Sequence, residues 1–136
     1  MVDTIPAARR SANMRAIHSK DTAPELTVRR LVYRLGYRYR LHARSLPGCP
    51  DLVFPGRRQL IFVHGCFWHG HSCKEGVREP KSNQPYWREK IVKNKARDVR
   101  QLEELGLSGW RVLVVWECET SDRGSLEEKI QRFLLA

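Results

Sequence analysis

The segment from Val63 to Cys73, with the sequence VHGCFWHGHSC, constrains this chain most, because it gathers metal-ligand side chains directly after an apolar run. A tetrahedral zinc site needs four such ligands, and a remote cysteine can supply the last one. The candidate ligands are Cys66, His71, Cys73 and Cys118. Spacing alone does not choose between His69 and His71 for the histidine. Such a site ties the loop to a distant strand, and the histidines left over are candidates for chemistry.

The charge of the chain favours a polyanionic partner. Its 136 residues carry 25 Lys and Arg against 15 Asp and Glu, for a formal net charge of +10. This excess indicates nucleic acid before a membrane surface, and the alternative is a solubilising basic surface. Cysteines that cluster with histidines are typical of a metal site rather than of disulfides, and reduced thiols suit the cytoplasm. Without a signal peptide or a membrane span, the chain is expected to be a soluble, cytoplasmic protein.

The chain divides into an arm and one domain. Residues 1–20 are rich in basic side chains and poor in large apolar ones. We expect a flexible basic arm that can lie along a DNA groove, and the alternative is a terminus without a role. Residues 21–136 are long enough for a single domain with its own core.

Helix signals and apolar alternation predict a mixed α/β fold. A capping residue, an early proline and an acidic first turn within residues 21–25 predict the start of a helix, and Gly36 ends it. On position alone, Glu25 in that first turn serves the helix dipole. The other expected elements are strands over 37–41, 51–54, 59–63 and 110–116, a helix from Tyr86 to Gly106, and a helix over 126–134 capped by Ser125. The most apolar strand, 110–116, is expected at the centre of a sheet covered by helices.

The predicted hairpin of strands 51–54 and 59–63 brings chemical groups to one edge. Antiparallel pairing places Asp51, which opens the first strand, close to His64, which follows the second. Magnesium takes one or two carboxylates, with waters and substrate phosphates completing its shell, so Asp51 is a candidate ligand. A backbone carbonyl near Val63 can add a second ligand. The alternative is that Asp51 only caps a turn.

Two histidines and one acid can then perform proton transfer. Phosphodiester hydrolysis needs a water deprotonated near neutral pH, and imidazole is suited to that task. His64 and His69 are the candidates, although either can instead compete with His71 for the metal. Asp98, on the basic helix, is available by residue type to orient the base.

Adjacent aromatics in a metal-held loop indicate contact with DNA bases. Phe67 and Trp68 can insert between base pairs, with Trp87 assisting, as minor-groove wedges do. The alternative for Phe67 and Trp87 is a place in the core, whereas Trp68 is expected to be more exposed. We assign Trp110 and Trp116, in the apolar strand, to the core.

Several stretches together closely resemble one protein family, the very-short-patch-repair mismatch endonucleases. The stretches are PGCPD at 47–51, IFVHGCFWH at 61–69 and WRVLVVWEC at 110–118, joined by SANMRAI at 11–17 and DTAPE at 21–25. The resemblance covers about residues 11 to 118. It implies a restriction-endonuclease-like fold and an enzyme that nicks one DNA strand 5′ to the thymine of a T·G mismatch, which arises when 5-methylcytosine deaminates.

The resemblance also implies roles for individual residues. Magnesium is bound by Asp51 and the Val63 carbonyl, and structural zinc by Cys66, His71, Cys73 and Cys118. His69 is the general base, supported by Asp98, with Glu25 and His64 assisting. Phe67, Trp68 and Trp87 form an intercalating wedge, Met14 enters from the other groove, and Lys90 and Asn94 lie near the mismatched pair. The implied partner is double-stranded DNA with a T·G mismatch. Because the lesion is asymmetric and one strand is cut, we expect a monomer, associated with the bacterial nucleoid, whose nick can be handed to a repair polymerase or to mismatch-repair proteins.

The sequence departs from the family pattern at three positions near the site. Val63 stands where a threonine is familiar, which is compatible with a ligand that is only a carbonyl. Gly70 replaces a histidine, and Cys49 is an additional thiol. Two further functions remain open: a zinc-stabilised DNA-binding module without catalysis, and a nickase of a defence or restriction system with a different site preference.

Overall fold

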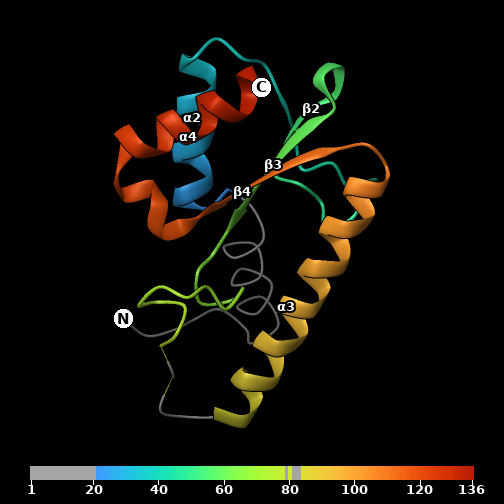
Figure 1. Ribbon diagram of the computed structural model, residues 1–136. Helices are drawn as coiled ribbons and strands as arrows, with labels where there is room; N and C mark the ends of the chain where they lie inside the picture. Colours follow the sequence, from blue (N-terminus) through green and yellow to red (C-terminus); the bar gives the residue numbers. More distant parts are fainter. Residues whose placement is uncertain (1–20, 79, 81–83) are drawn as a thin grey trace, which may run out of the picture.

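The computed structural model of the chain describes residues 21–78, 80 and 84–136 (Figure 1). The predicted arm, residues 1–20 with Met14, lies outside the described residues. Within them, no helix is long and apolar enough to cross a membrane.

Three helices and one four-stranded sheet make up the described fold, which confirms a mixed α/β class. The elements in order are α2 (Ala23–Arg34), β1 (Arg40–Leu41), β2 (Leu52–Phe54), β3 (Gln59–His64), α3 (Gln84–Leu107), β4 (Arg111–Trp116) and α4 (Arg123–Leu135). Short 3-10 turns follow β2 and β4. The sheet order is β1-β2-β3-β4, with β3 antiparallel to β2 and parallel to β4.

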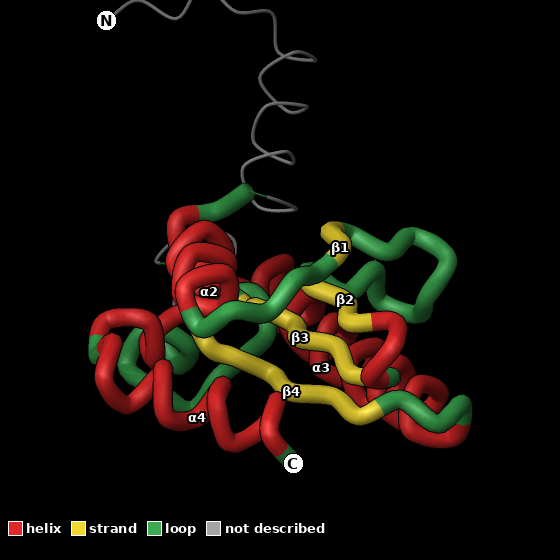
Figure 2. The backbone as a smooth tube through the Cα atoms, turned by 90° about the horizontal axis from the view of Figure 1, so that it is seen from above, coloured by secondary structure: helices red, strands yellow, loops and turns green. Residues whose placement is uncertain are grey.

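The helices cover both faces of the sheet, as Figures 1 and 2 show from two directions. Helices α2 and α4 lie together on one face, and the long helix α3 crosses the other. Each face has its own apolar core. Val32 of α2 and Ile130 of α4 meet Ile61 of β3 in the first core, whereas Leu105 of α3 meets Leu60 and Phe62 of β3 in the second.

Strand alternation decides which face receives the chemical groups. Successive side chains of a strand point to opposite faces. Because Leu60 and Phe62 pack toward α3, His64 at the end of β3 points to the same face, where it contacts Phe62. The edge where β2 begins and β3 ends therefore faces the helix that carries Asp98.

The strand predicted for the centre of the sheet is an edge strand of the described fold. Strand β4 pairs only with β3, and β3, which is almost wholly buried, occupies an interior position. Half-buried side chains over most of β4 agree with this position. The apolar sequence of β4 reflects cover by helices on both faces, because a parallel strand is apolar on both sides wherever it lies in the sheet.

Other element boundaries differ from expectation for local reasons. Only Arg40 and Leu41 pair as β1, because the Tyr37 N–H donates to the Val32 carbonyl at the end of α2. Helix α4 begins before Ser125, since the Asp122 carboxylate accepts from the Ser125 N–H at 3.2 Å and acts as the cap. The start of α2 is as predicted, with Thr22 as N-cap and Glu25 in the first turn.

Candidate active site

A buried carboxylate lies at the edge where β2 begins and β3 ends. Asp51 is 9% exposed, and its Oδ2 accepts a hydrogen bond from the Val63 N–H at 2.7 Å. The hairpin thus brings Asp51 and the end of β3 together as expected. Desolvation by burial raises the pKa of the Asp51 carboxyl to about 6, against the smaller opposing effect of the Val63 N–H. The fold therefore holds a carboxylate whose charge is only partly compensated.

The uncompensated charge of Asp51 should cost stability at neutral pH. Because the pKa of Asp51 is higher in the folded than in the unfolded state, the folded protein binds more protons between about pH 4 and 6. The free energy of unfolding therefore falls as pH rises through that range. We expect Asp51→Asn to raise the free energy of unfolding by roughly 2 kcal/mol above pH 6. The gain shrinks toward pH 4.

Urea unfolding of both proteins between pH 5 and 8, in magnesium-free buffer, measures this gain. Added Mg²⁺ should stabilise the native protein and leave the Asp51→Asn variant unaffected. Equal stability of the two proteins at pH 7.5 without Mg²⁺ would contradict the assignment of a destabilising buried charge to Asp51.

Two histidines stack beside this carboxylate. The imidazole rings of His64 and His69 are parallel, with centroids 3.9 Å apart. Burial, with a smaller contribution from His69, lowers the pKa of His64 to about 4, so His64 is uncharged at neutral pH. His69 comes from the loop after β3, and its Nδ1 lies 2.6 Å from Asp98 Oδ2 on α3. The expected pairing of His69 with Asp98 is therefore present.

The contact between His69 and Asp98 fixes the His69 imidazole, which lines a pocket together with Asp51 and His64. The family resemblance implies that His69 is a general base in DNA nicking, so we expect Asp98→Asn to lower the single-turnover nicking rate by about 10- to 100-fold, the typical cost of replacing a partner that orients such a histidine. DNA affinity should stay unchanged. Glu103→Gln, the same charge change on an exposed part of α3, is the control, and an equal loss in both variants would exclude a specific role for Asp98.

Gly70 lets the loop approach α3 at this point. It adopts a positive φ of 61°, and a Cβ built there would lie 2.7 Å from Lys95 Cδ and 2.9 Å from Ile91 Cγ2. The replacement of the familiar histidine by Gly70 thus goes with close packing of the loop on α3, next to His69.

Glu25 has a different environment from the one expected. It is 2% exposed, and its Oε2 contacts the guanidinium of Arg29 and lies 2.9 Å from His42 Nε2. This buried network, and not the helix dipole alone, determines its position. The network adjoins the carboxylate site, because the His42 N–H donates to the Asp51 carbonyl at 3.2 Å.

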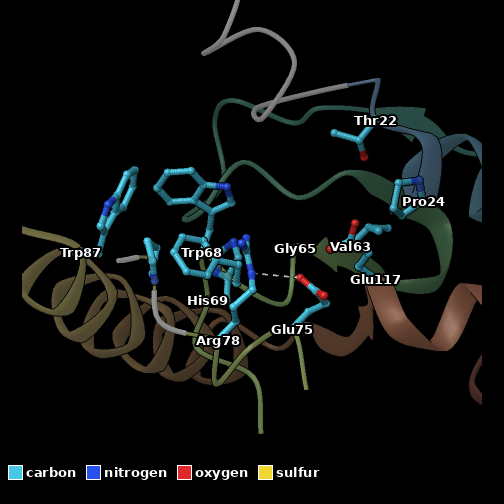
Figure 3. Close-up of a pocket in the computed structure, with 12 residues that line it drawn as sticks. Thr22, Pro24, Val63, Gly65, Trp68, His69, Glu75, Arg78, Trp87 and Glu117 are labelled. Carbon is cyan, nitrogen blue, oxygen red and sulfur yellow. Dashed lines mark ion pairs between the residues drawn. The ribbon is translucent and has the colours of Figure 1, made fainter. Parts of the chain in front are cut away.

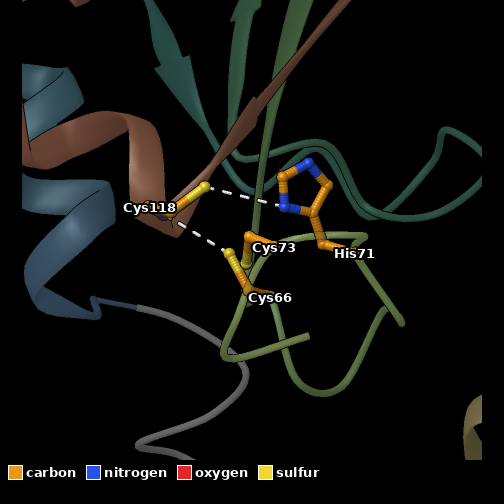
Figure 4. A group of neighbouring side chains, drawn as sticks. All are labelled: Cys66, His71, Cys73 and Cys118. Carbon is orange, nitrogen blue, oxygen red and sulfur yellow. Dashed lines mark hydrogen bonds between the residues drawn. The ribbon is translucent and has the colours of Figure 1, made fainter. Parts of the chain in front are cut away.

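The predicted zinc ligands form one cluster. Figure 4 shows four side chains from two distant segments pointing toward a common centre: Cys66, His71, Cys73 and Cys118. Their ligand atoms all lie within 4.8 Å of one another, so the group can hold a metal ion. Cys118 Sγ is 3.6 Å from His71 Nδ1, close to the separation of about 3.5 Å between donors of tetrahedral zinc. The donor types and spacing fit that ion.

The geometry also separates the two histidines that spacing left open. His71 faces the thiols and stacks on Trp116 at 4.2 Å between ring centroids, whereas His69 faces Asp98. Trp116, assigned to the core from sequence, is instead half-buried at this boundary, where it also meets His64. Trp110 packs against the core between the sheet and α3, as expected.

An aromatic cluster borders a second pocket, drawn in Figure 3. Phe67, Trp68 and Trp87 meet edge to face, with centroids 5.1 to 5.7 Å apart. All three are half-buried, so Trp68 is less exposed than predicted. They line this pocket together with His69 and Val63, which places an aromatic surface next to the stacked histidines.

The two polar residues expected near the mismatched pair lie on α3. Asn94 donates from Nδ2 to the Trp68 carbonyl at 2.9 Å and so fixes the aromatic loop to the helix. Lys90 is exposed, and its ammonium lies 5.9 Å from the centre of the Tyr86 ring.

Sequence reasoning missed residues that the fold brings to the site. Arg29 follows Glu25 by four positions on one helix, a spacing that indicates an ion pair. His42 carried no such signal. Arg44 and Arg97 line the pocket that contains Asp51, His64 and His69, and only long-range contacts place them there.

Comparisons with known proteins show which family the chain resembles. A family model described as DNA mismatch endonuclease Vsr matches residues 2–75. The type II nicking enzyme V.XorIIP of Xanthomonas oryzae pv. oryzae is 52% identical over 134 residues, which cover 98% of each chain. The DNA mismatch endonuclease Vsr of Escherichia coli is 44% identical over 129 residues, which cover 95% of this chain and 82% of the relative.

A third relative extends the similarity to another bacterium. The type II nicking enzyme V.NmeAIP of Neisseria meningitidis serogroup A is 42% identical over 134 residues, covering 98% of this chain and 95% of the relative. With a family model that matches more than half of it and relatives this similar along nearly its whole length, the chain belongs to the Vsr family of DNA mismatch endonucleases.

Proposed function

We propose that this DNA endonuclease nicks one strand 5′ to the thymine of a T·G mismatch, in a magnesium-dependent reaction that begins very short patch repair. The observation that carries the proposal is the convergence of Asp51, His64 and the His69–Asp98 pair at one end of the hairpin. A DNA-binding module without catalysis needs none of these groups.

The carboxylate site fits a divalent cation. Asp51 is buried with a raised pKa, because the Val63 N–H, the Asp51 N–H and the nearby charge of Arg29 offset only part of its desolvation. A bound cation would relieve the rest. Asp51 and the Val63 carbonyl would hold Mg²⁺, with waters and substrate phosphate oxygens completing its shell. When bound, the ion would supply charge stabilisation to the scissile phosphate and the leaving oxygen.

Proton transfer is assigned to the histidines. His69 accepts the proton of the attacking water, and Asp98 holds its ring in place through Nδ1. His64, uncharged because of its burial, leaves His69 free of a second positive charge at 3.9 Å. Glu25 assists from the neighbouring network, where it orders Arg29 and His42 beside Asp51.

The remaining parts hold the protein together and read the DNA. Cys66, His71, Cys73 and Cys118 bind a structural zinc ion. Phe67, Trp68 and Trp87 insert at the mismatch, Lys90 and Asn94 lie near the mismatched pair, and Met14 enters from the other groove.

The organisation of the whole molecule follows from the same proposal. Residues 1–20 act as a basic arm on a single restriction-endonuclease-like domain of residues 21–136. The protein acts in the bacterial cytoplasm. It acts as a monomer, because the lesion is asymmetric and one strand is cut. Its nick is handed to a repair polymerase or to mismatch-repair proteins.

A strand-labelled nicking assay tests the proposal. The substrate is a duplex with one T·G pair in a cytosine-methylation context, beside a C·G control, with and without Mg²⁺. We expect one Mg²⁺-dependent nick next to the mismatched thymine and none in the control. Binding to the mismatched duplex without a nick would contradict the catalytic assignment.

A second candidate function follows from the names of two relatives, which are type II nicking enzymes. In this alternative the chemistry is the same but the protein serves a restriction or defence system and reads a different site. Equal nicking of mismatched and fully paired duplexes, or a preference for paired modified cytosine, would favour this candidate over repair.

A further inference from the structure

The pocket that contains Asp51 is lined on two sides by different segments of the chain, here called its walls. One wall is the loop before β2, which carries Arg44 and Cys49, and the other is α3, which carries Arg97 and Asp98. Within the loop, the Leu46 N–H donates to the Ala43 carbonyl and the Cys49 N–H to the Leu46 carbonyl, both at 3.1 Å. The loop backbone is therefore held by its own hydrogen bonds.

Gly48 brings this loop against α3. Its φ is 79°, and a Cβ built at this position would lie 2.9 Å from Gln101 Oε1 and 3.0 Å from the Phe62 ring, so the two walls meet at one end of the pocket. The backbone that carries Arg44 is consequently held at a fixed distance from α3, which carries Arg97.

The acids of the pocket do not neutralise these arginines. Asp51 accepts from the Val63 N–H, and Asp98 pairs with His69. Neither Arg44 nor Arg97 forms a hydrogen bond or an ion pair with a carboxylate within the described ranges 21–78, 80 and 84–136, and both are exposed. In contrast, Arg29 and Arg132 are each paired with an acid.

Two guanidinium groups without an acidic partner, on facing walls, suit phosphate oxygens. Arginine binds phosphate through parallel N–H donors, and a groove with positive walls follows a nucleic acid backbone. Because Asp51 and His64 lie on the floor between the walls, a strand whose phosphate reaches the floor passes both arginines.

We propose that Arg44 and Arg97 form a phosphate clamp that grips the backbone of the nicked strand on the two sides of the scissile phosphate. The clamp rests on the proposed nicking of DNA and specifies which part of the substrate is held. It positions the strand, and it takes no part in proton transfer.

Removing either arginine should weaken binding in a salt-dependent way. We expect Arg44→Ala and Arg97→Ala each to raise the Kd for the mismatched duplex about 5- to 10-fold at moderate salt, and to reduce the slope of log Kd against log salt by about 1. Fluorescence anisotropy without added Mg²⁺ measures binding free of cleavage. Arg132→Ala, the same charge change on α4 at the opposite face of the sheet, should have neither effect.

Duplexes with one neutral methylphosphonate locate the contacts. Neutralising a phosphate within about two positions of the nick should weaken binding of the native protein, but not of the variant that lacks the arginine contacting that phosphate. Binding by both variants equal to that of Arg132→Ala, or additive effects at every tested phosphate, would overturn the clamp. If the native protein binds the mismatched duplex without nicking it, while each arginine remains coupled to a phosphate of one strand, the proposed function fails and phosphate binding by the two arginines stands.

Discussion

Asp51→Asn should lower the rate of DNA nicking by at least about a thousandfold, equivalent to a loss of about 4 kcal/mol of transition-state stabilisation. Asparagine has nearly the same shape, and its side-chain oxygen can still accept from the Val63 N–H that now bonds Asp51. It lacks the charge that holds a divalent cation. Single-turnover nicking of a strand-labelled T·G duplex, at saturating protein and Mg²⁺, measures the loss.

Two further measurements make this result specific. DNA affinity and bound zinc should equal those of the native protein, because Asp51 is distinct from the Cys/His cluster and the aromatic surface. Asp122→Asn, which removes an exposed helix-capping carboxylate, should nick at close to the native rate. An Asp51→Asn variant that retains more than about a tenth of the native rate would show that the carboxylate is not a metal ligand essential to the reaction.

If the Cys/His cluster holds zinc as proposed, Cys118→Ser should abolish zinc binding and lower the melting temperature by about 10 °C or more, since binding energy at a structural zinc site is folding energy. Cys118 is the one ligand of the cluster that comes from the segment after β4, so its loss frees the loop after β3. That loop carries His69 and the aromatic pair, and nicking should fall with the zinc content.

Cys49→Ser provides the matched control for this result. Cys49 is an exposed free thiol outside the metal cluster, so its variant should keep one zinc ion per chain and the native melting temperature. Elemental analysis and calorimetry measure both quantities. Full zinc content in the Cys118→Ser variant would contradict the assignment of Cys118 as a ligand.

Local sequence signals located the parts of the site that depend on short-range geometry. The hairpin turn brings Asp51 to the end of β3 through antiparallel pairing alone, and the helix signals around Pro24 set the start of α2. Short spacing assigned Cys66 and Cys73 to one candidate metal cluster. These predictions needed only the periodicity and turn chemistry of neighbouring residues.

The residue environments that the sequence left undetermined depend on contacts between distant segments. His69 and His71 lie two residues apart, and only the position of Asp98 on α3 and of Cys118 after β4 separates their environments. Burial of Glu25 with His42 depends in the same way on how α2 meets the following loop. Trp116 looked like a core residue because its strand is apolar, but the edge position of β4 leaves it beside the histidines.

The separation of floor and walls in the Asp51 pocket has an evolutionary consequence. The floor holds Asp51 and His64 at buried strand ends, where substitutions disturb the core, whereas the walls and the aromatic surface belong to two surface loops and one side of α3. Mutations can therefore alter which DNA is gripped while the cutting chemistry is inherited unchanged. A protein with this arrangement can change its DNA target through substitutions in the pocket walls and the aromatic surface.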